Sequence, residues 1–228
     1  MSILALKDVS YSYEDKKSHK ARLGKNVLKN INVSFEKGKV YAVIGKSGSG
    51  KSTLLSLIAG LDVCKSGEVL FNGKSLKDVD RDAYRSKNIG VIFQSFNLIT
   101  NMSAVANVVL SMNISGIAIP NKKEHAYGLF IKVGIDKETA DRKILKLSGG
   151  EQQRIAITRA LSHNPDIIIA DEPTGNLDAE TEDDVLKILS SLAKEEGKCV
   201  IIVTHSKKVA GVADEVWGIK DGSIALAK

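Results

Sequence analysis

The chain has 228 residues, of which 43% are hydrophobic and 26% charged, and this composition predicts one globular unit rather than two ordinary domains. No stretch approaches the ~18 consecutive apolar residues that suggest a membrane span, so we expect a soluble chain. The net charge of +6 suits nucleic acid, an anionic membrane surface or a phosphorylated ligand, and does not choose among them.

The first residues and the two cysteines indicate the cellular compartment and the state of the thiols. The segment Met1–Asp8 lacks the features of a secretory signal, so we expect the protein to stay in the cytosol. Cys64 and Cys199 have unrelated positions, which argues against a disulfide framework or a metal site and favours two buried thiols.

The amino-terminal part predicts two strands around a basic segment. The runs Ile3–Tyr13 and Val27–Phe35 are β-like and form an expected antiparallel pair. Between them, residues 14–26 are rich in basic side chains and contain no aromatic residue, which is typical of a solvated loop. The basic residues are Lys16, Lys17, His19, Lys20, Arg22 and Lys25.

A strand, a loop and a helix follow in order. The strand is expected at Val40–Ile44, the loop is the sequence GKSGSGKST, and the helix spans Lys51–Ala59. Helical periodicity dominates from Asn97 to Lys146, so we expect a helical subdomain there. The other elements expected before residue 147 are strands at Val69–Phe71 and Ile89–Phe93 and helices at Ser103–Met112 and Asn121–Val133.

Two apolar runs, Ile167–Ala170 and Val200–Val203, do not alternate with polar residues. Strands of this kind are buried on both faces, as in a parallel sheet covered by helices. The intervening segment Ala179–Glu196 has apolar residues at helical spacing, so the three segments predict a strand, helix, strand unit.

The glycine-rich loop fits the pattern G-x-x-x-x-G-K-[ST] through Gly45, Gly50, Lys51 and Ser52, with a strand before it and a helix after it. Such a loop directs backbone N–H groups at phosphate oxygens, and the helix N-terminus adds partial positive charge. Lys51 would reach the β and γ phosphates and Ser52 would hold Mg²⁺; the alternative is a flexible Gly/Ser loop. The candidate phosphate-binding residues are Gly45, Lys46, Ser47, Gly48, Ser49, Gly50, Lys51, Ser52 and Thr53.

The apolar run Ile167–Ala170 ends in Asp171 and Glu172. Ligands of open α/β sheets lie at the carboxyl ends of strands. Asp171 would hold Mg²⁺ through its water shell, and Glu172 would act as general base on the attacking water. The alternative is a buried strand that ends in solvated charges.

The segment LSGGEQQR contains a predicted helix start, because Ser148 and Glu151 form the capping box S-x-x-E. Capping does not require two glycines. We therefore interpret Ser148, Gly149 and Gly150 as a second phosphate contact at a helix N-terminus.

These motifs resemble those of the ATP-binding cassette (ABC) ATPases over essentially the whole chain. GKSGSGKST is similar to their Walker A motif, LSGGEQQR to their signature motif, and IIIADEPTGNLD to their Walker B segment followed by the D-loop, which includes Asp178. The resemblance implies that Gln94 senses Mg²⁺ and the γ-phosphate, that His205 contacts the γ-phosphate, and that Tyr13 stacks on adenine, with Tyr11 as its rival.

The resemblance also implies a fold and partners. The fold is α/β: a P-loop NTPase core of the RecA type with a mainly parallel sheet, an antiparallel β subdomain and an inserted helical subdomain. A single domain would place the core in residues 1–94 and 163–228 and the helices in about 95–162. Two chains would form a homodimer with each ATP between the Walker A motif of one and the signature motif of the other.

The residues of these motifs are similar to those in the subgroup of ABC ATPases that serves macrolide-export, lipoprotein-release and antimicrobial-peptide-resistance permeases. This similarity implies an ATPase at the inner face of the cell membrane that drives a separate permease chain, with a peptide, antibiotic or amphiphile as the exported substrate and with no nucleic acid. A cell-division ATPase that transports nothing is the main alternative; DNA-repair or translation-linked ABC proteins and a small-molecule kinase fit less well. Ser206 replaces the acidic residue frequent after the histidine, and we expect it to cap a helix.

Overall fold

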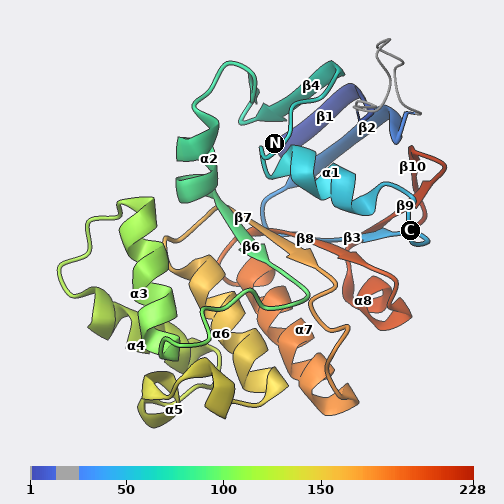
Figure 1. Ribbon diagram of the computed structural model, residues 1–228. Coiled ribbons are helices and arrows are strands. Elements are labelled where there is room, and N and C mark those ends of the chain that lie inside the picture. The colour runs from blue at the N-terminus through green and yellow to red at the C-terminus, as the bar shows by residue number, and fades with distance from the viewer. Residues whose placement is uncertain (1, 14–25) are drawn as a thin grey trace, which may run out of the picture.

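Two β-sheets organise the computed structural model, which describes residues 2–13 and 26–228 (Figure 1). The basic segment predicted as a solvated loop lies outside the described residues, except for Asn26. The first sheet is antiparallel, in the order β2-β1-β4-β5. Its strands are β1 (Ser2–Tyr11), β2 (Leu28–Glu36), β4 (Ser66–Phe71) and β5 (Lys74–Ser75). The expected pairing of the first two runs is confirmed, with Leu6 opposite Val33 and Val9 opposite Ile31.

The second sheet has the order β10-β9-β3-β8-β7-β6 and is parallel except at its edge, where β10 runs antiparallel to β9. The two apolar runs predicted as parallel neighbours are paired, with Ile169 opposite Ile201. The strands are β3 (Val40–Ile44), β6 (Ile89–Ile92), β7 (Ile167–Asp171), β8 (Cys199–Thr204), β9 (Glu215–Lys220) and β10 (Ser223–Leu226).

Most helices begin at a side chain that accepts a backbone hydrogen bond, which satisfies one of the free N–H groups of the first turn. These caps are Asp80, Ser103, Asn121, Asp136, Ser148 and Asp178. The helices are α1 (Lys51–Ile58), α2 (Arg81–Asn88), α3 (Ala104–Ser115), α4 (Lys122–Lys132), α5 (Lys137–Asp141), α6 (Gly149–Leu161), α7 (Ala179–Lys194) and α8 (Lys207–Val212), with a 3₁₀ turn at Ile144–Lys146.

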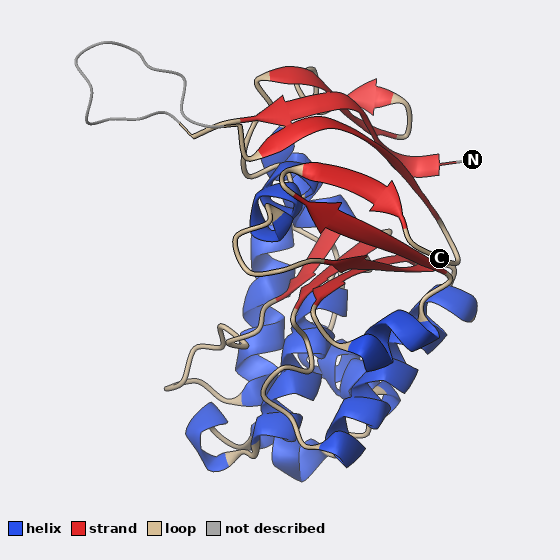
Figure 2. Ribbon diagram, turned by 90° about the vertical axis from the view of Figure 1, so that its right-hand side faces the viewer, coloured by secondary structure: helices blue, strands red, loops and turns tan. Residues whose placement is uncertain are grey.

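The parallel sheet divides the hydrophobic core into two layers, because successive side chains point to opposite faces. Tyr41 and Val43 face the layer that includes α1 and the antiparallel sheet, whereas Val40 and Ala42 face the layer that includes α3, α4, α6 and α7. The views agree: α1 lies between the two sheets, and the larger group of helices covers the other face (Figures 1 and 2). The division of the chain into a core and a helical subdomain stays a prediction, since α3, α4 and α6 share one hydrophobic layer with β3 and β7.

Two parts of the fold were not predicted. Helix α2 has no apolar periodicity; it is anchored by Tyr84, which is buried and donates to the carbonyl of Ile58 over 2.9 Å. The hairpin β9-β10 turns at Asp221 and Gly222, both with positive φ, and an Asp-Gly pair is a recognised hairpin signal that could have located it. The two cysteines are buried and free, as expected, and burial raises the pKa of the Cys199 thiol to about 12.

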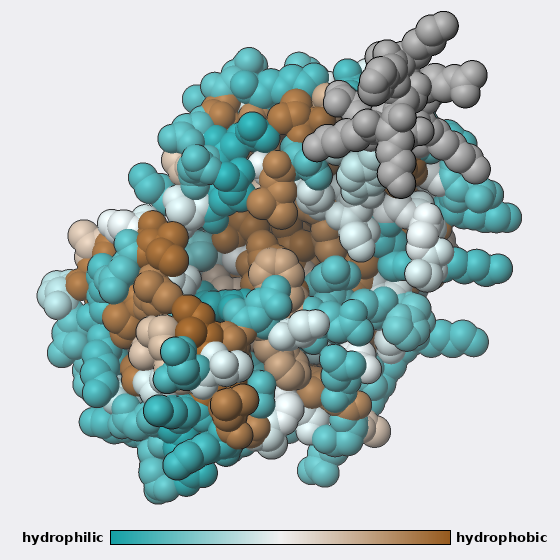
Figure 3. Space-filling model, in the orientation of Figure 1, coloured by the Kyte–Doolittle hydropathy of each residue, from teal (hydrophilic) through white to brown (hydrophobic). Residues whose placement is uncertain are grey.

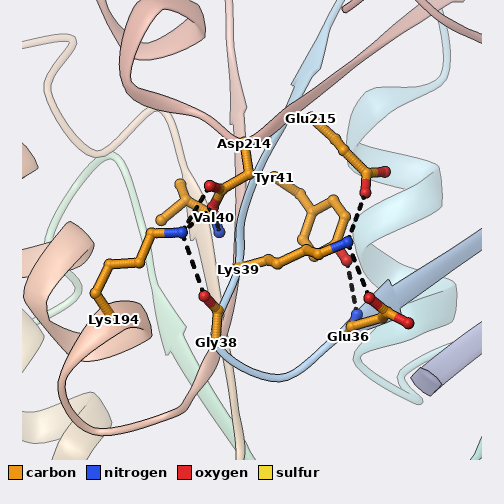
Figure 4. A network of polar contacts seen from close by, with 8 residues as sticks. All are labelled: Glu36, Gly38, Lys39, Val40, Tyr41, Lys194, Asp214 and Glu215. Carbon is orange, nitrogen blue, oxygen red and sulfur yellow. Dashed lines mark hydrogen bonds and ion pairs between the residues drawn. The ribbon is translucent and has the colours of Figure 1, made fainter. Parts of the chain in front are cut away.

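A polar network fixes the amino end of β3 to β9 (Figure 4). Asp214 accepts from the backbone N–H of Val40 over 2.7 Å and from Lys194 Nζ over 2.6 Å. Partial burial of Asp214 opposes its ionisation, but the hydrogen bonds from Lys194 and Val40 prevail and hold the pKa of Asp214 below its usual value. On the other side of the strand, Lys39 pairs with Glu36 and Glu215. The network therefore fixes where β3 begins, and with it the register that leads to Ile44.

We predict that Asp214→Asn lowers the free energy of unfolding at pH 7 by about 1 kcal/mol, because the amide has no negative charge to pair with Lys194 and replaces one acceptor oxygen by a donor. The lowered pKa in the folded state makes this contribution full above the unfolded carboxyl pKa of about 3.9 and progressively absent as the pH falls through the folded value. Urea unfolding at pH 7 and at acid pH measures both. Asp184→Asn, which breaks an exposed ion pair with Lys187, serves as control. An equal loss in that variant, or a difference that persists at the lowest pH, contradicts the assignment.

Candidate functional site

A pocket of about 700 Å³ lies where β3, β7 and β8 end. It brings together most of the residues predicted for the site, including the carboxylates after β7 and the histidine after β8. The lining residues are Tyr13, Val27, Gly45, Lys46, Ser47, Gly48, Gly50, Lys51, Ser52, Thr53, Gln94, Asp171, Glu172 and His205.

The glycine loop curls tightly between β3 and α1. Gly48 and Gly50 have φ of 75° and 110°, backbone angles that residues with a side chain rarely adopt. Gly45 cannot carry a side chain, because a Cβ there would lie 2.6 Å from the carbonyl oxygen of Ile219. Ser49 turns away from the pocket: its N–H donates to the carbonyl of Lys46 over 3.2 Å and its hydroxyl is buried.

The start of α1 suits a phosphate group. Its N-cap residue is Gly50, and no side chain in the described part of the chain caps the first turn, so backbone N–H groups and partial positive charge face the pocket. Lys51 donates to the carbonyls of Gly45 and Lys46 over 2.8 and 3.1 Å, which holds its ammonium group across the loop. The donor set fits a polyphosphate.

Asp171 is half-buried at the end of β7. Burial raises the pKa of Asp171, the neighbouring Glu172 carboxylate raises it further, and Lys51 lowers it. A hydroxyl from Ser52 and this carboxylate line the same pocket, and oxygen ligands of this kind suit a hard divalent cation.

Glu172 has a strained backbone and an ordered side chain. Its φ is 46°, a conformation that costs about 1–3 kcal/mol in a residue other than glycine. The side chain is 13% exposed, accepts from Thr204 Oγ1 over 3.0 Å, and lies 2.8 Å from His205 Nδ1. Its own N–H donates to the carbonyl of Val203 over 2.8 Å. These contacts fix a carboxylate at the pocket wall, where a general base would act.

The two tyrosines near the end of β1 have different surroundings. Tyr11 is buried in the core, whereas Tyr13 is 52% exposed and lines the pocket. The hydroxyl of Tyr13 lies 3.0 Å from Thr53 Oγ1, and its ring meets Tyr11 edge to face. An exposed ring at the mouth of the pocket can stack on a flat ligand; Tyr11 cannot reach one without leaving the core.

Gln94 follows β6 and lies beside the loop that follows Glu172. Asn176 Nδ2 donates to the carbonyl of Gln94 over 3.4 Å, and a Cβ on Gly175 would lie 3.4 Å from the Gln94 amide nitrogen. The chain then turns through Phe96 and Asn97, both with positive φ, and the guanidinium of Arg159 donates to the carbonyl of Asn97.

The signature residues do not line this pocket. Ser148 and Glu151 form the predicted capping box, with hydrogen bonds of 3.2 and 2.7 Å. A Cβ on Gly149 would meet no described heavy atom within 4 Å, so this residue leaves open space. A Cβ on Gly150 would lie 2.6 Å from Thr181 Cγ2, so a neighbour within the chain already explains the second glycine.

Asp178 belongs to the same group as the signature glycines. It caps α7 by accepting from the N–H and the hydroxyl of Thr181 over 2.9 and 2.8 Å. The hydrogen bond from the Thr181 N–H lowers the pKa of the Asp178 carboxyl. The structure thus divides the predicted residues into a pocket and a second group that consists of Ser148, Gly149, Gly150 and Asp178.

Two residues in or beside the pocket were not predicted from the sequence, and one expected role was wrong. Val27 lines the pocket, and Thr204 holds Glu172; a hydroxyl at the end of a buried strand was the available signal for Thr204. Ser206 precedes α8, but its side chain caps no described N–H group. The expectation of a cap was wrong because the hydroxyl instead donates to Glu182 Oε1 over 3.2 Å.

Comparisons with known proteins agree with this arrangement. Residues 28–175 match the ABC transporter family. The ABC transporter ATP-binding protein YclH of Bacillus subtilis is 42% identical over 99% of this chain and 97% of its own length. The macrolide export ATP-binding/permease protein MacB of Syntrophobacter fumaroxidans is 40% identical, over 98% of this chain but 31% of that protein. The lipoprotein-releasing system ATP-binding protein LolD of Francisella tularensis is 38% identical over 98% and 96%.

Solved structures show the same fold. The dimeric structure of MJ0796, a bacterial ABC transporter cassette, has a TM-score of 0.86 and 36% identity over 97% of this chain and 96% of that one. A post-hydrolysis state of the same cassette bound to ADP and Pi has a TM-score of 0.85 and 34% identity over 99% of both chains. The predicted fold class, a P-loop NTPase with a mainly parallel sheet, is confirmed. With a matching family model, a common fold and the expected nucleotide-binding motifs, this chain belongs to the ABC transporter family, as an ATP-binding cassette similar to the macrolide-export and lipoprotein-release subgroup.

Proposed function

We propose that this protein hydrolyses ATP to drive a membrane permease on a separate chain. The observation that carries the proposal is the position of Glu172, an ordered carboxylate on the wall of the same pocket as the phosphate loop. A general base contributes about 10²–10⁴-fold to a rate. In this role Glu172 orients and deprotonates the attacking water, and His205, 2.8 Å away, stabilises charge that develops on the γ-phosphate.

The other pocket residues bind and orient the nucleotide. The loop N–H groups and Lys51 hold the phosphates, and the ring of Tyr13 stacks on adenine. Ser52, Gln94 and, through water, Asp171 would hold Mg²⁺, which would neutralise charge on the phosphates. Partial burial raises the pKa of Asp171, and a nearby cation would offset this effect by stabilising the carboxylate.

The second group of residues serves a second copy of the chain. Ser148, Gly149 and Asp178 lie outside the pocket, and Gly149 leaves open space at the start of α6. In a head-to-tail homodimer this helix start closes on the ATP that the partner binds. The dimeric structure of the cassette MJ0796 supports such an assembly.

The membrane partner contacts the loop around Phe96. Hydrophobic side chains gather on the face over α3 (Figure 3). The exposed Ile114 lies on α3, and the exposed Ile99 donates its N–H to Asn107 of the same helix. Within residues 2–13 and 26–228, no helix has the length and apolar character needed to cross a membrane. The relative MacB is named an ATP-binding/permease protein, and this chain matches 31% of its length.

We place the present protein in the cytoplasm, peripheral on the inner face of the cell membrane, with a peptide, antibiotic or amphiphile as the exported substrate and no nucleic acid.

Trapping the dimer tests the proposed reaction. We predict that Glu172→Gln reduces ATP hydrolysis at least 10²-fold and accumulates a dimer in ATP and Mg²⁺, measured by light scattering, because bound ATP is no longer consumed. Lys51→Ala in the same background removes a phosphate contact and should remain monomeric. A Glu172→Gln protein that binds ATP by calorimetry yet stays monomeric, or that still hydrolyses ATP at the normal rate, contradicts the proposal.

Substitutions at the two signature glycines distinguish a packing role from a role in ATP hydrolysis. Gly150→Ala should lower the free energy of unfolding by about 1–3 kcal/mol, since its Cβ meets Thr181 Cγ2. Adding Thr181→Ser removes that methyl group, retains the hydroxyl that bonds Asp178, and should restore stability in urea unfolding. Gly149→Ala should keep its stability but lose ATPase activity, because the open space is where the partner's nucleotide fits. A fully active Gly149→Ala dimer contradicts this role.

The permease contact has its own test. Phe96→Ala should leave the ATPase rate of the isolated protein unchanged and abolish stimulation by the permease in a reconstituted complex. Ile131→Ala, a similarly apolar but 73% exposed position on α4, is the matched control and should remain stimulated. Normal stimulation of the Phe96→Ala complex would place the contact elsewhere.

A further inference from the structure

Glu182 receives hydrogen bonds from two loops that flank the pocket. It lies in the first turn of α7, and its side chain is only 19% exposed. Its Oε1 accepts from Thr174 Oγ1 over 3.1 Å and from Ser206 Oγ over 3.2 Å. Thr174 is two residues after Glu172, and Ser206 is next to His205. One carboxylate oxygen therefore holds the segment after the candidate base and the segment after the candidate histidine.

The contacts continue to Glu172 without a break. The N–H of Ser206 donates to Thr204 Oγ1 over 2.9 Å, and that hydroxyl donates to Glu172 Oε2 over 3.0 Å. Glu182 is thus joined to the candidate general base through the hydroxyl and the backbone N–H of Ser206 and then through Thr204. Loss of Glu182 would free the Ser206 side chain and would loosen the segment whose backbone N–H donates to Thr204.

The first turn of α7 also reaches the signature glycines. Glu182 N–H donates to the carbonyl of Asp178 over 2.9 Å, and Asp178 holds Thr181, whose methyl group packs against Gly150. The pocket of this chain and the helix start that would close the partner's pocket are therefore attached to one helical turn.

We infer that Glu182 is a positioning residue for hydrolysis. It holds the His205 and Glu172 loops against α7, so that the catalytic groups and the signature helix keep a fixed relation. Ser206 occupies a position where an acidic residue is frequent in the resembling family; here the carboxylate comes from α7 and Ser206 is its donor. This inference rests on the proposed function, because it concerns the efficiency of the same ATPase site.

The negative charge of Glu182 has a partner as well. Lys208 Nζ lies 3.7 Å from Glu182 Oε2 and 2.8 Å from Asp183 Oδ1. Lys208 is on α8, directly after the histidine segment. Asp183 shares this lysine but touches neither Thr174 nor Ser206 in the described contacts, so it is a natural control on the adjacent residue.

The first experiment compares Glu182→Ala, Glu182→Gln and Asp183→Asn. Steady-state ATP hydrolysis should show kcat reduced at least about tenfold in Glu182→Ala, because the variant loses two hydrogen bonds to a charged group. KM for ATP and the Kd for magnesium-ATP from calorimetry should stay within about twofold of the wild type, since no phosphate contact is lost. Glu182→Gln keeps one acceptor oxygen and should fall between, and Asp183→Asn should equal the wild type.

A swapped carboxylate guards against a variant that only damages folding. Ser206→Asp alone should lower kcat, because two carboxylates then lie side by side. Combined with Glu182→Ala, Ser206→Asp returns a single carboxylate to the same spot and should recover most of kcat, whereas nonspecific damage would add. Three results would overturn the inference. They are an unchanged kcat in Glu182→Ala, a fall in its kcat that is matched by weaker nucleotide binding and lower thermal stability, and additive losses of kcat in the double variant. A wild-type protein without ATPase activity would instead refute the proposed function.

Discussion

The parallel pairing of β3, β8 and β7 is the constraint on which the site depends. Their register places Ile44 beside Thr204 and Asp171 beside Val203. The loops that follow the three strands therefore leave the sheet at the same end, where the strands have their carboxyl ends. Each strand is buried on both faces, and a slip by one residue would exchange the two hydrophobic layers. The hydrophobic core therefore decides which polar groups meet in the pocket. β8 contributes directly as well, since the carbonyl of Val203 accepts from the strained residue Glu172.

Much of the site at these carboxyl ends was predictable, because the sequence patterns that indicate it are local. The apolar runs, the glycine loop and the acidic pair after β7 are each contiguous in sequence, and the rule that ligands lie at the carboxyl ends of parallel strands brings them together. Helix α2 was not predictable in this way, since a single buried residue, Tyr84, carries its packing. The choice between Tyr11 and Tyr13 also needed coordinates: β1 ends at Tyr11, and only beyond that point does the chain leave the core.

The signature segment shows why a glycine alone does not identify a ligand site. Sequence reasoning assigned both glycines to a close approach by phosphate. The structure separates them, because Thr181 of the same chain occupies the space beside Gly150 while the space beside Gly149 is open. A backbone that must be approached closely looks the same in a sequence whether the neighbour is a ligand or a helix. Glu182 was missed for a related reason, since a glutamate in the first turn of a helix is already explained by the helix dipole.

Helix α6 connects the parts that ATP would move. Its amino end carries the capping box and Gly149; one turn later the buried Gln153 donates to the carbonyl of Pro173, directly after Glu172, over 2.7 Å. Near its other end Arg159 donates to the carbonyl of Asn97, beside the hydrophobic Phe96 turn. A helix is stiff along its axis, so its amino end and these two attachments keep a fixed spacing. A shift of the segment around Pro173 would therefore move the signature end and the Phe96 turn together, which gives the proposed ATPase cycle a direct mechanical path to the proposed permease contact.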